Sequence, residues 1–143
     1  MKKRNHRLVA LALIGALAIF GMEGASASPS RALNENSANK VYAVKVGSHL
    51  SLTLHSMYWS LSKEPATSGI SEVGSVIAKP ILPGPNAPAG CKLPGMGCGT
   101  QTWNFVAKKA GTYQITATRT SCGEALQCTG SQGSYAVTIR VKK

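Results

Sequence analysis

Apolar and polar residues alternate along most of the chain beyond about residue 40, which is the pattern of half-buried β-strands. The clearest case is residues 50–54, in which three leucines alternate with serine and threonine. Further alternating, β-branched or aromatic runs predict strands at 41–46, 57–61, 70–77 (interrupted at Gly74), 100–105, 113–117 and 135–141. About seven short strands and no convincing helix in this part predict an all-β fold, an immunoglobulin-like antiparallel β-sandwich.

Two of these predicted strands flank a short turn. A glycine-rich stretch leads into the strand at 100–105, and Lys108–Gly111 then has the composition of a turn in which glycine supplies a positive φ. We therefore predict a β-hairpin over residues 97–120. The residues expected to contribute most to the core are the aromatic ones: Trp59, Trp103, Phe105 and Tyr113.

The N-terminal region has a different pattern. Residues 1–7 are basic, residues 8–20 are apolar, and Ala25-Ser26-Ala27 follows, which together are typical of a secretory signal peptide. The apolar run is short for a membrane span, so residues 1–27 are predicted to be a cleaved signal peptide that leaves no membrane anchor. Residues 28–39 are predicted to be a flexible arm, and 40–143 the folded domain. The expected location is secreted, periplasmic or at the cell envelope.

The net charge does not change the predicted fold or location. The 143 residues carry a net charge of +11. Residues 28–143 contain twelve Lys and Arg against four Glu and no Asp, a net charge of +8. The cations are scattered, with no run longer than two, whereas a nucleic-acid-binding surface is usually marked by clustered Lys and Arg. The sequence therefore does not predict nucleic-acid binding, and the charge favours solubility or attraction to acidic surfaces.

All four cysteines lie in the part predicted to be exported, where disulfides form. Four cysteines allow three pairings, among which the sequence does not choose. The spacings are wider than the C-x₂₋₄-C of zinc sites, so neither a metal nor another cofactor is predicted. The cysteines expected to form two disulfides are Cys91, Cys98, Cys122 and Cys128.

Residues 79–99 contain five prolines and five glycines, too many for regular secondary structure. Two cysteines fall inside this stretch. A surface loop held by a disulfide is therefore predicted, and long ordered loops are usually functional.

The residues give little support for an enzyme. Only His49 and His55 are available as imidazole bases in the predicted mature chain, and no aspartate is present to orient either one. Oxidised cysteines are not nucleophiles. Glu64 and Glu72 flank a loop, and nothing in the sequence places them together as a carboxylate pair. We predict a protein without catalytic activity.

Several segments, in order over residues 41–141, resemble the chagasin family of inhibitors of papain-like cysteine peptidases. The resemblance rests on the glycine-rich stretch 97–105, the Gly111-Thr112-Tyr113 turn, the segment Ser56-Met57-Tyr58-Trp59 and Arg119. It implies an immunoglobulin-like fold whose loops at one end fill the active-site cleft of a peptidase.

The resemblance also implies the residues that contact the peptidase. The glycine-rich loop would lie across the catalytic cysteine, with one further loop on each side of it. The function implied is an exported, monomeric inhibitor that blocks the cleft reversibly, although the sequence does not identify the peptidase. The expected contact residues are Met96, Gly97, Cys98 and Gly99 in the centre, His55, Ser56 and Tyr58 on one flank, and Arg119, Thr120 and Ser121 on the other.

Two segments depart from the family pattern. Only His55-Ser56 stand where the family has a longer loop before its tyrosine, and Arg119 is not followed by the family's Pro-Trp pair. An alternative function therefore stays open: a non-inhibitory immunoglobulin-like module that has a structural role or binds an acidic partner in the cell envelope.

Overall fold

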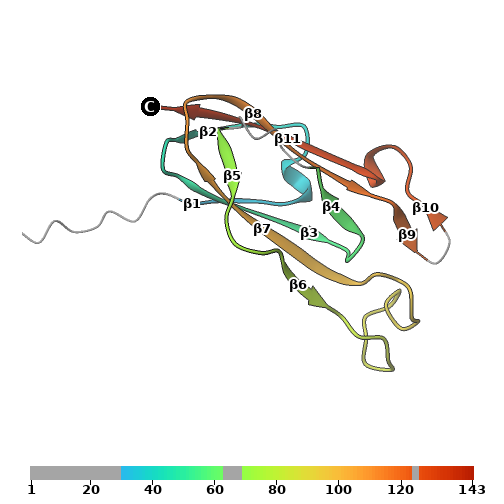
Figure 1. Cartoon of the computed structure of the whole chain (residues 1–143). Helices are drawn as coiled ribbons and strands as arrows, with labels where there is room; N and C mark the ends of the chain where they lie inside the picture. Colours follow the sequence, from blue (N-terminus) through green and yellow to red (C-terminus); the bar gives the residue numbers. More distant parts are fainter. Residues whose placement is uncertain (1–29, 63–68, 124–125) are drawn as a thin grey trace, which may run out of the picture.

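The computed structural model describes residues 30–62, 69–123 and 126–143, which form two packed β-sheets and a separate two-stranded sheet (Figure 1). The predicted signal peptide lies outside these residues. Among the residues described, no helix is long and apolar enough to cross a membrane.

The strands are β1 (Ser30–Leu33), β2 (Val41–Lys45), β3 (His49–His55), β4 (Trp59–Leu61), β5 (Ile70–Glu72), β6 (Ile77–Pro80), β7 (Gly99–Ala107), β8 (Gly111–Arg119), β9 (Ser121–Gly123), β10 (Leu126–Gln127) and β11 (Ser134–Lys142), with 3₁₀ turns η1 (Glu35–Ser37) and η2 (Gly130–Gln132).

The first sheet has the order β1-β3-β7-β5, and β6 pairs with β7 along the same edge as β5. Strands β3 and β7 are antiparallel, in register from His49 opposite Val106 to His55 opposite Thr100. The alternation at residues 50–54 places Leu50, Leu52 and Leu54 in the core, as that pattern predicts.

The second sheet has the order β2-β11-β8-β4. Strand β11 runs antiparallel to β8, whereas β2 runs parallel to β11 and, in the first sheet, β1 runs parallel to β3. These two parallel pairs are edge pairs. The all-β sandwich predicted from the sequence is confirmed, and its two sheets are mixed rather than purely antiparallel.

The predicted hairpin over residues 97–120 is wrong. Strands β7 and β8 belong to different sheets, so residues 108–110 cross from one layer to the other. Buried Phe105 of β7 and buried Ile115 of β8 accordingly contribute to the core from opposite sheets. An alternating strand, a short turn and another alternating strand fit either arrangement, because the alternation shows only which residues face the core.

The core contains three of the four aromatic side chains predicted for it. Trp59, Trp103 and Phe105 are buried, and Tyr113 packs against them from a partly buried position. The Tyr113 hydroxyl donates a hydrogen bond to the carbonyl of Ala110 at 3.2 Å. This bond ties the crossing turn to the sheet that follows it.

The predicted flexible arm at 28–39 also needs correction for the residues that the structure describes. Ser30–Leu33 form β1, and the side chain of Leu33 is buried. Asn34 then caps η1 by accepting a hydrogen bond from the backbone N–H of Asn36 at 3.0 Å. A four-residue strand with only one buried side chain gives too weak a periodic signal to be seen in the sequence.

Candidate functional site

Three segments that are distant in the sequence meet at one end of the sandwich, at the lower right of Figure 1. They are the turn between β3 and β4, the long loop between β6 and β7, and the segment between β8 and β11. We call this region the loop end and define it as residues 55–58, 81–98, 119–123 and 126–133. These segments contain all of the expected contact residues except Gly99, which follows directly as the first residue of β7.

The glycine-rich segment 97–99 is held on both sides by main-chain hydrogen bonds. The backbone N–H groups of Ser56 and Met57 donate to the carbonyls of Gly99 and Gly97 at 2.9 and 2.7 Å. On the other side, the N–H of Ile81 donates to the carbonyl of Cys98 at 3.1 Å. These bonds extend the β3·β7 and β6·β7 ladders, so the segment is a continuation of the sheet rather than a free loop.

Close packing explains the two glycines of this segment. Gly97 has φ +62°, and a Cβ atom there would lie 2.1 Å from the ring of Tyr58. At Gly99, with φ +137°, a Cβ atom would lie 2.5 Å from the carbonyl oxygen of Lys79. Both positions therefore require glycine for conformation and for space. The Tyr58 hydroxyl also donates to the carbonyl of Gly95 at 2.6 Å, which fixes the ring over the loop.

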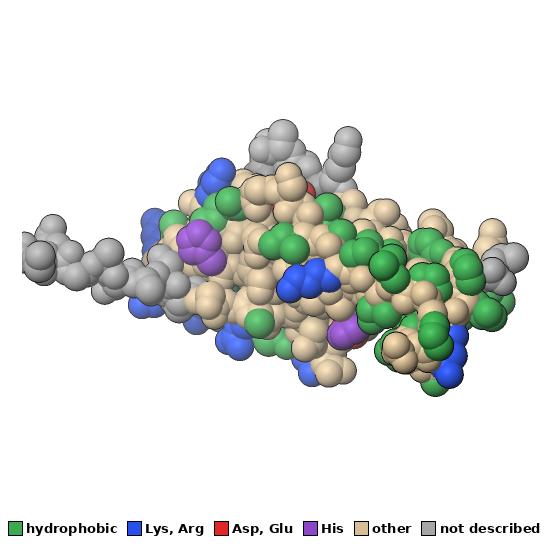
Figure 2. Space-filling model, turned by 90° about the horizontal axis from the view of Figure 1, so that it is seen from below, with side chains coloured by type: hydrophobic (Ala, Val, Ile, Leu, Met, Phe, Trp, Pro, Cys, Tyr) green, Lys and Arg blue, Asp and Glu red, His purple; other side chains and the backbone are tan. Residues whose placement is uncertain are grey.

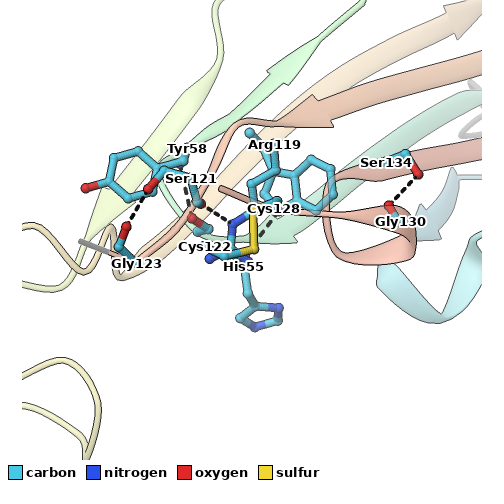
Figure 3. Close-up of a disulfide and its surroundings, with 11 residues drawn as sticks. His55, Tyr58, Arg119, Ser121, Cys122, Gly123, Cys128, Gly130 and Ser134 are labelled. Atoms are coloured by element: carbon cyan, nitrogen blue, oxygen red, sulfur yellow. Dashed lines mark hydrogen bonds between the residues drawn. A yellow bond between two sulfur atoms is a disulfide. The ribbon is translucent and has the colours of Figure 1, made fainter. Parts of the chain in front are cut away.

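Two disulfides hold the outer parts of the loop end, as Figure 3 shows for one of them. The bridges join Cys91 to Cys98 and Cys122 to Cys128, so the two local bridges form among the three possible pairings. The first closes the tip of the long loop onto the glycine-rich segment. No cysteine is free, and the presence of two bridges indicates an oxidising environment.

The segment after β8 is shaped by side-chain hydrogen bonds to its own backbone (Figure 3). The guanidinium Nε of Arg119 donates to the carbonyl of Ser121 at 2.9 Å, and the Ser121 hydroxyl donates to the carbonyl of Gly123 at 2.7 Å. Thr120 lies between them and is exposed. This side of the loop end is thus built around the Arg119 side chain.

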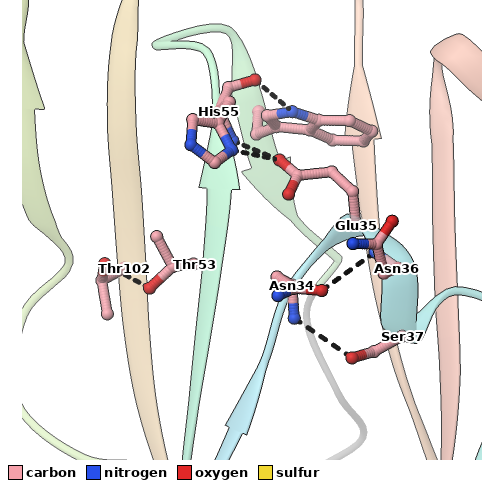
Figure 4. A network of polar contacts seen from close by, with 8 residues as sticks. Asn34, Glu35, Asn36, Ser37, Thr53, His55 and Thr102 are labelled. Carbon is pink, nitrogen blue, oxygen red and sulfur yellow. Dashed lines mark hydrogen bonds and ion pairs between the residues drawn. The ribbon is translucent and has the colours of Figure 1, made fainter.

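An acidic residue that the sequence did not indicate lies beside His55 (Figure 4). Oε1 of Glu35 accepts a hydrogen bond from the backbone N–H of His55 and lies 3.1 Å from its Nδ1. Partial burial alone would raise the pKa of the Glu35 carboxyl, but the hydrogen bonds to His55 and to its own backbone outweigh burial and leave it below 4.5. The carboxylate therefore holds η1 against the end of β3.

Seven of the ten expected contact residues line one hollow of about 290 Å³ at this end. Tyr58 lines an adjoining hollow together with Met96, Gly97 and Cys98, while Thr120 and Ser121, which follow Arg119 in the sequence, line neither hollow. The seven are His55, Ser56, Met96, Gly97, Cys98, Gly99 and Arg119. The structure therefore brings together the three groups of residues that the resemblance placed on separate loops.

The exposure of these residues divides them into two kinds. Ser56 is buried and has φ +134°, and its hydroxyl accepts a hydrogen bond from the N–H of Tyr58 at 3.1 Å. Gly99 is buried as well. Neither is placed for the direct contact expected of it; both position the neighbouring loops. His55 in contrast exposes three quarters of its side chain.

Several large apolar side chains of the loop end are exposed and were missed from the sequence. Leu82 and Leu93 are 77% and 64% exposed, and Ile81 is 43% exposed. Figure 2 shows the hydrophobic side chains gathered at the right-hand end of the molecule. The sequence signal for these exposed residues was the presence of large apolar side chains in a stretch rich in proline and glycine. Such a stretch forms no regular element with a buried face, so its apolar side chains remain in solvent.

Among the residues that the structure describes, no group of three or more His, Cys, Asp or Glu side chains is arranged to hold a metal ion. The groups available for contact at the loop end include apolar side chains, main-chain polar groups, the exposed His55 imidazole and the cationic side chains of Lys92 and Arg119.

No protein-family model matches the sequence, and no curated protein matches it significantly. Solved structures do share its fold. The cysteine protease inhibitor EhICP2 from Entamoeba histolytica superposes with a TM-score of 0.55 at 11% identity, over 80% of this chain and 97% of its own. Amebosin superposes with a TM-score of 0.51 at 14% identity, over 80% of this chain and 100% of its own. At the level of fold, the predicted resemblance to the chagasin family is confirmed.

Proposed function

We propose that the protein is an exported inhibitor of papain-like cysteine peptidases that blocks the active-site cleft reversibly with its loop end. The observation that carries the proposal is the convergence of seven expected residues around one hollow at a single end of the sandwich, five of them at least partly exposed. The fold likeness to EhICP2, which is described as a cysteine protease inhibitor, supports the same conclusion.

The loop end suits insertion into a narrow cleft because its segments are already ordered. Main-chain hydrogen bonds and the Cys91–Cys98 disulfide fix residues 97–99, so little conformational entropy is lost on binding. The exposed Leu82 and Leu93 offer apolar surface for burial against the peptidase. All four cysteines are bridged, so none offers a free thiol to the peptidase, and the mode of inhibition that we propose is non-covalent.

The experiment is a titration of papain with the monomeric mature protein, residues 28–143, followed by rapid dilution. We expect stoichiometric loss of peptidase activity that returns on dilution, and no loss of activity in a serine peptidase treated identically. No inhibition at micromolar concentration across several papain-like peptidases would overturn the proposal.

A second candidate function is supported by the turn between β3 and β4. This turn contains only residues 56–58. The backbone N–H groups of Ser56 and Met57 and the hydroxyl of Tyr58 already donate hydrogen bonds within the protein. A chain with this turn could retain the fold as a non-inhibitory module of the cell envelope. Failure to inhibit peptidases, together with salt-sensitive sedimentation with envelope material, would favour this second function.

A further inference from the structure

Half of the twelve Lys and Arg residues that look scattered in residues 28–143 lie at the end of the sandwich opposite the loop end. We call this region the basic end and define it as residues 30–31, 45–49, 107–111 and 141–143. These segments hold six Lys and Arg residues and no acidic residue. The six are Arg31, Lys45, Lys108, Lys109, Lys142 and Lys143.

Main-chain hydrogen bonds show that these segments are contiguous. The N–H of Val46, in the turn after β2, donates to the carbonyl of Lys142 at 2.8 Å. The next residue, Gly47, donates to the carbonyl of Ala107 at 2.7 Å, directly before Lys108. One turn thus joins the ends of β2, β7 and β11 and places their terminal lysines around it. In Figure 2, Lys and Arg side chains accordingly gather toward the left-hand end.

A hollow of about 320 Å³ opens between the edge strands β1 and β2 at this end. Its lining includes Ala43 and Val44 as well as three cations, Arg31, Lys45 and Lys142. The Arg31 guanidinium lies 5.1 Å from the centre of the Tyr42 ring, which orients it beside the opening. An apolar lining with cations around it fits an amphipathic anion better than a small inorganic one.

We propose that the basic end docks on a membrane surface rich in anionic lipids and leaves the loop end facing away from it. Each lysine close to such a surface strengthens binding roughly fivefold, so the five lysines of the basic end together produce substantial attraction without a membrane anchor. The side chain of Val46, 45% exposed in the middle of the lysines, adds apolar contact at the headgroups.

The arrangement of the cations favours a membrane over a soluble polyanion. The lysines surround the tip of one end, where three strands terminate, whereas a linear polymer is bound by cations arranged along a stripe or groove.

The test is co-sedimentation of the mature protein with vesicles of equal parts phosphatidylglycerol and phosphatidylcholine, or of phosphatidylcholine alone. We expect binding to the anionic vesicles only, and release as salt rises well above about 0.1 M, where screening acts within about 10 Å. Lys108→Gln with Lys109→Gln should weaken the partition on the order of twentyfold. The matched control, Lys79→Gln with Lys92→Gln, removes two lysines near the loop end and should change it little.

Equal losses in the two double variants would overturn the proposal, because binding would then depend on net charge alone. Binding to soluble dextran sulfate without binding to anionic vesicles would also overturn it and assign the surface to a polyanion. Circular dichroism of each variant verifies that the fold is intact. Because papain inhibition is a separate readout, vesicle binding is tested whether or not the protein inhibits peptidases.

Discussion

The loop end and the basic end of this sandwich differ in almost every physical property. The loop end combines long segments, two disulfides and exposed leucines, whereas the basic end has tight turns and six cations. Strands of nine residues, spanning about 30 Å, separate them. Two surfaces this far apart can act without interfering, so a change at one end should leave the function of the other intact.

The largest effect is expected from Gly97→Ala at the loop end. The new Cβ atom needs a strained positive φ and would displace the Tyr58 ring, so we expect a loss of about 3 kcal/mol in unfolding free energy and most of the papain inhibition. Gly90→Ala is the matched control, since Gly90 is in the same loop, has φ +84° and has open space around it. Urea unfolding and papain titration of both variants measure the difference. Equal losses would show that the Tyr58 contact is unimportant.

Removal of the Cys91–Cys98 disulfide should have the next largest effect. Cys91→Ser with Cys98→Ser opens a loop with a sequence separation of 7, and chain entropy predicts a loss of roughly 2–3 kcal/mol in unfolding free energy. We expect weaker papain inhibition and unchanged vesicle binding, because this bridge lies only in the loop end. A parallel loss of vesicle binding would mean that the two ends are coupled.

Replacing the exposed leucines should affect inhibition more than stability. Leu82→Ser with Leu93→Ser removes apolar surface that is already in solvent, so the free energy of unfolding should change by less than about 0.5 kcal/mol. Papain inhibition should weaken on the order of tenfold as the buried apolar contact is lost. Lys108→Gln with Lys109→Gln should do the reverse, leaving inhibition constants unchanged while vesicle binding falls. Unaltered inhibition by the leucine variant would exclude these side chains from the contact.

The smallest effect concerns Glu35 and pH. Because its pKa is lowered by folding, the carboxylate stabilises the folded state above pH 4.5, and this contribution is lost as the pH falls through the folded-state pKa. Glu35→Gln should therefore be slightly less stable than the wild type at neutral pH and equal to it in strong acid. The difference is small since the side chain is 41% exposed. Thermal unfolding across this pH range, with Glu72→Gln as the control, measures it.

The strands whose burial follows a local alternation of apolar and polar residues were predicted correctly from the sequence. The alternation at 50–54 and 135–141 reports burial directly, and the predicted strands there are present as β3 and β11. Alternation cannot tell which strand pairs with which, and for that reason the hairpin over 97–120 was wrong. Seven of the ten expected contact residues line one hollow, but the motifs did not show that Ser56 and Gly99 are buried.

Long-range contacts explain what else the sequence did not reveal. Glu35 reaches His55 only because η1 packs beside the end of β3, and no spacing in the sequence indicates that contact. The basic end is similar, because its lysines are far apart in the chain and meet only where strands end. Charge clustering along the sequence is therefore a poor guide to charge clustering on a sandwich, in which every strand end is a possible neighbour of every other.

The parallel pairing of β2 with β11 has a consequence for the order of folding. It joins residues 41–45 to residues 138–142, so the second sheet cannot close until nearly all of the described chain has been synthesised. Sheets that depend on such distant pairings form slowly, typically in milliseconds to seconds. The two disulfides, which link cysteines only 7 and 6 residues apart, need no such closure. The two disulfides can therefore form before the sandwich is complete, so that the loop end is constrained while the basic end is still unfolded.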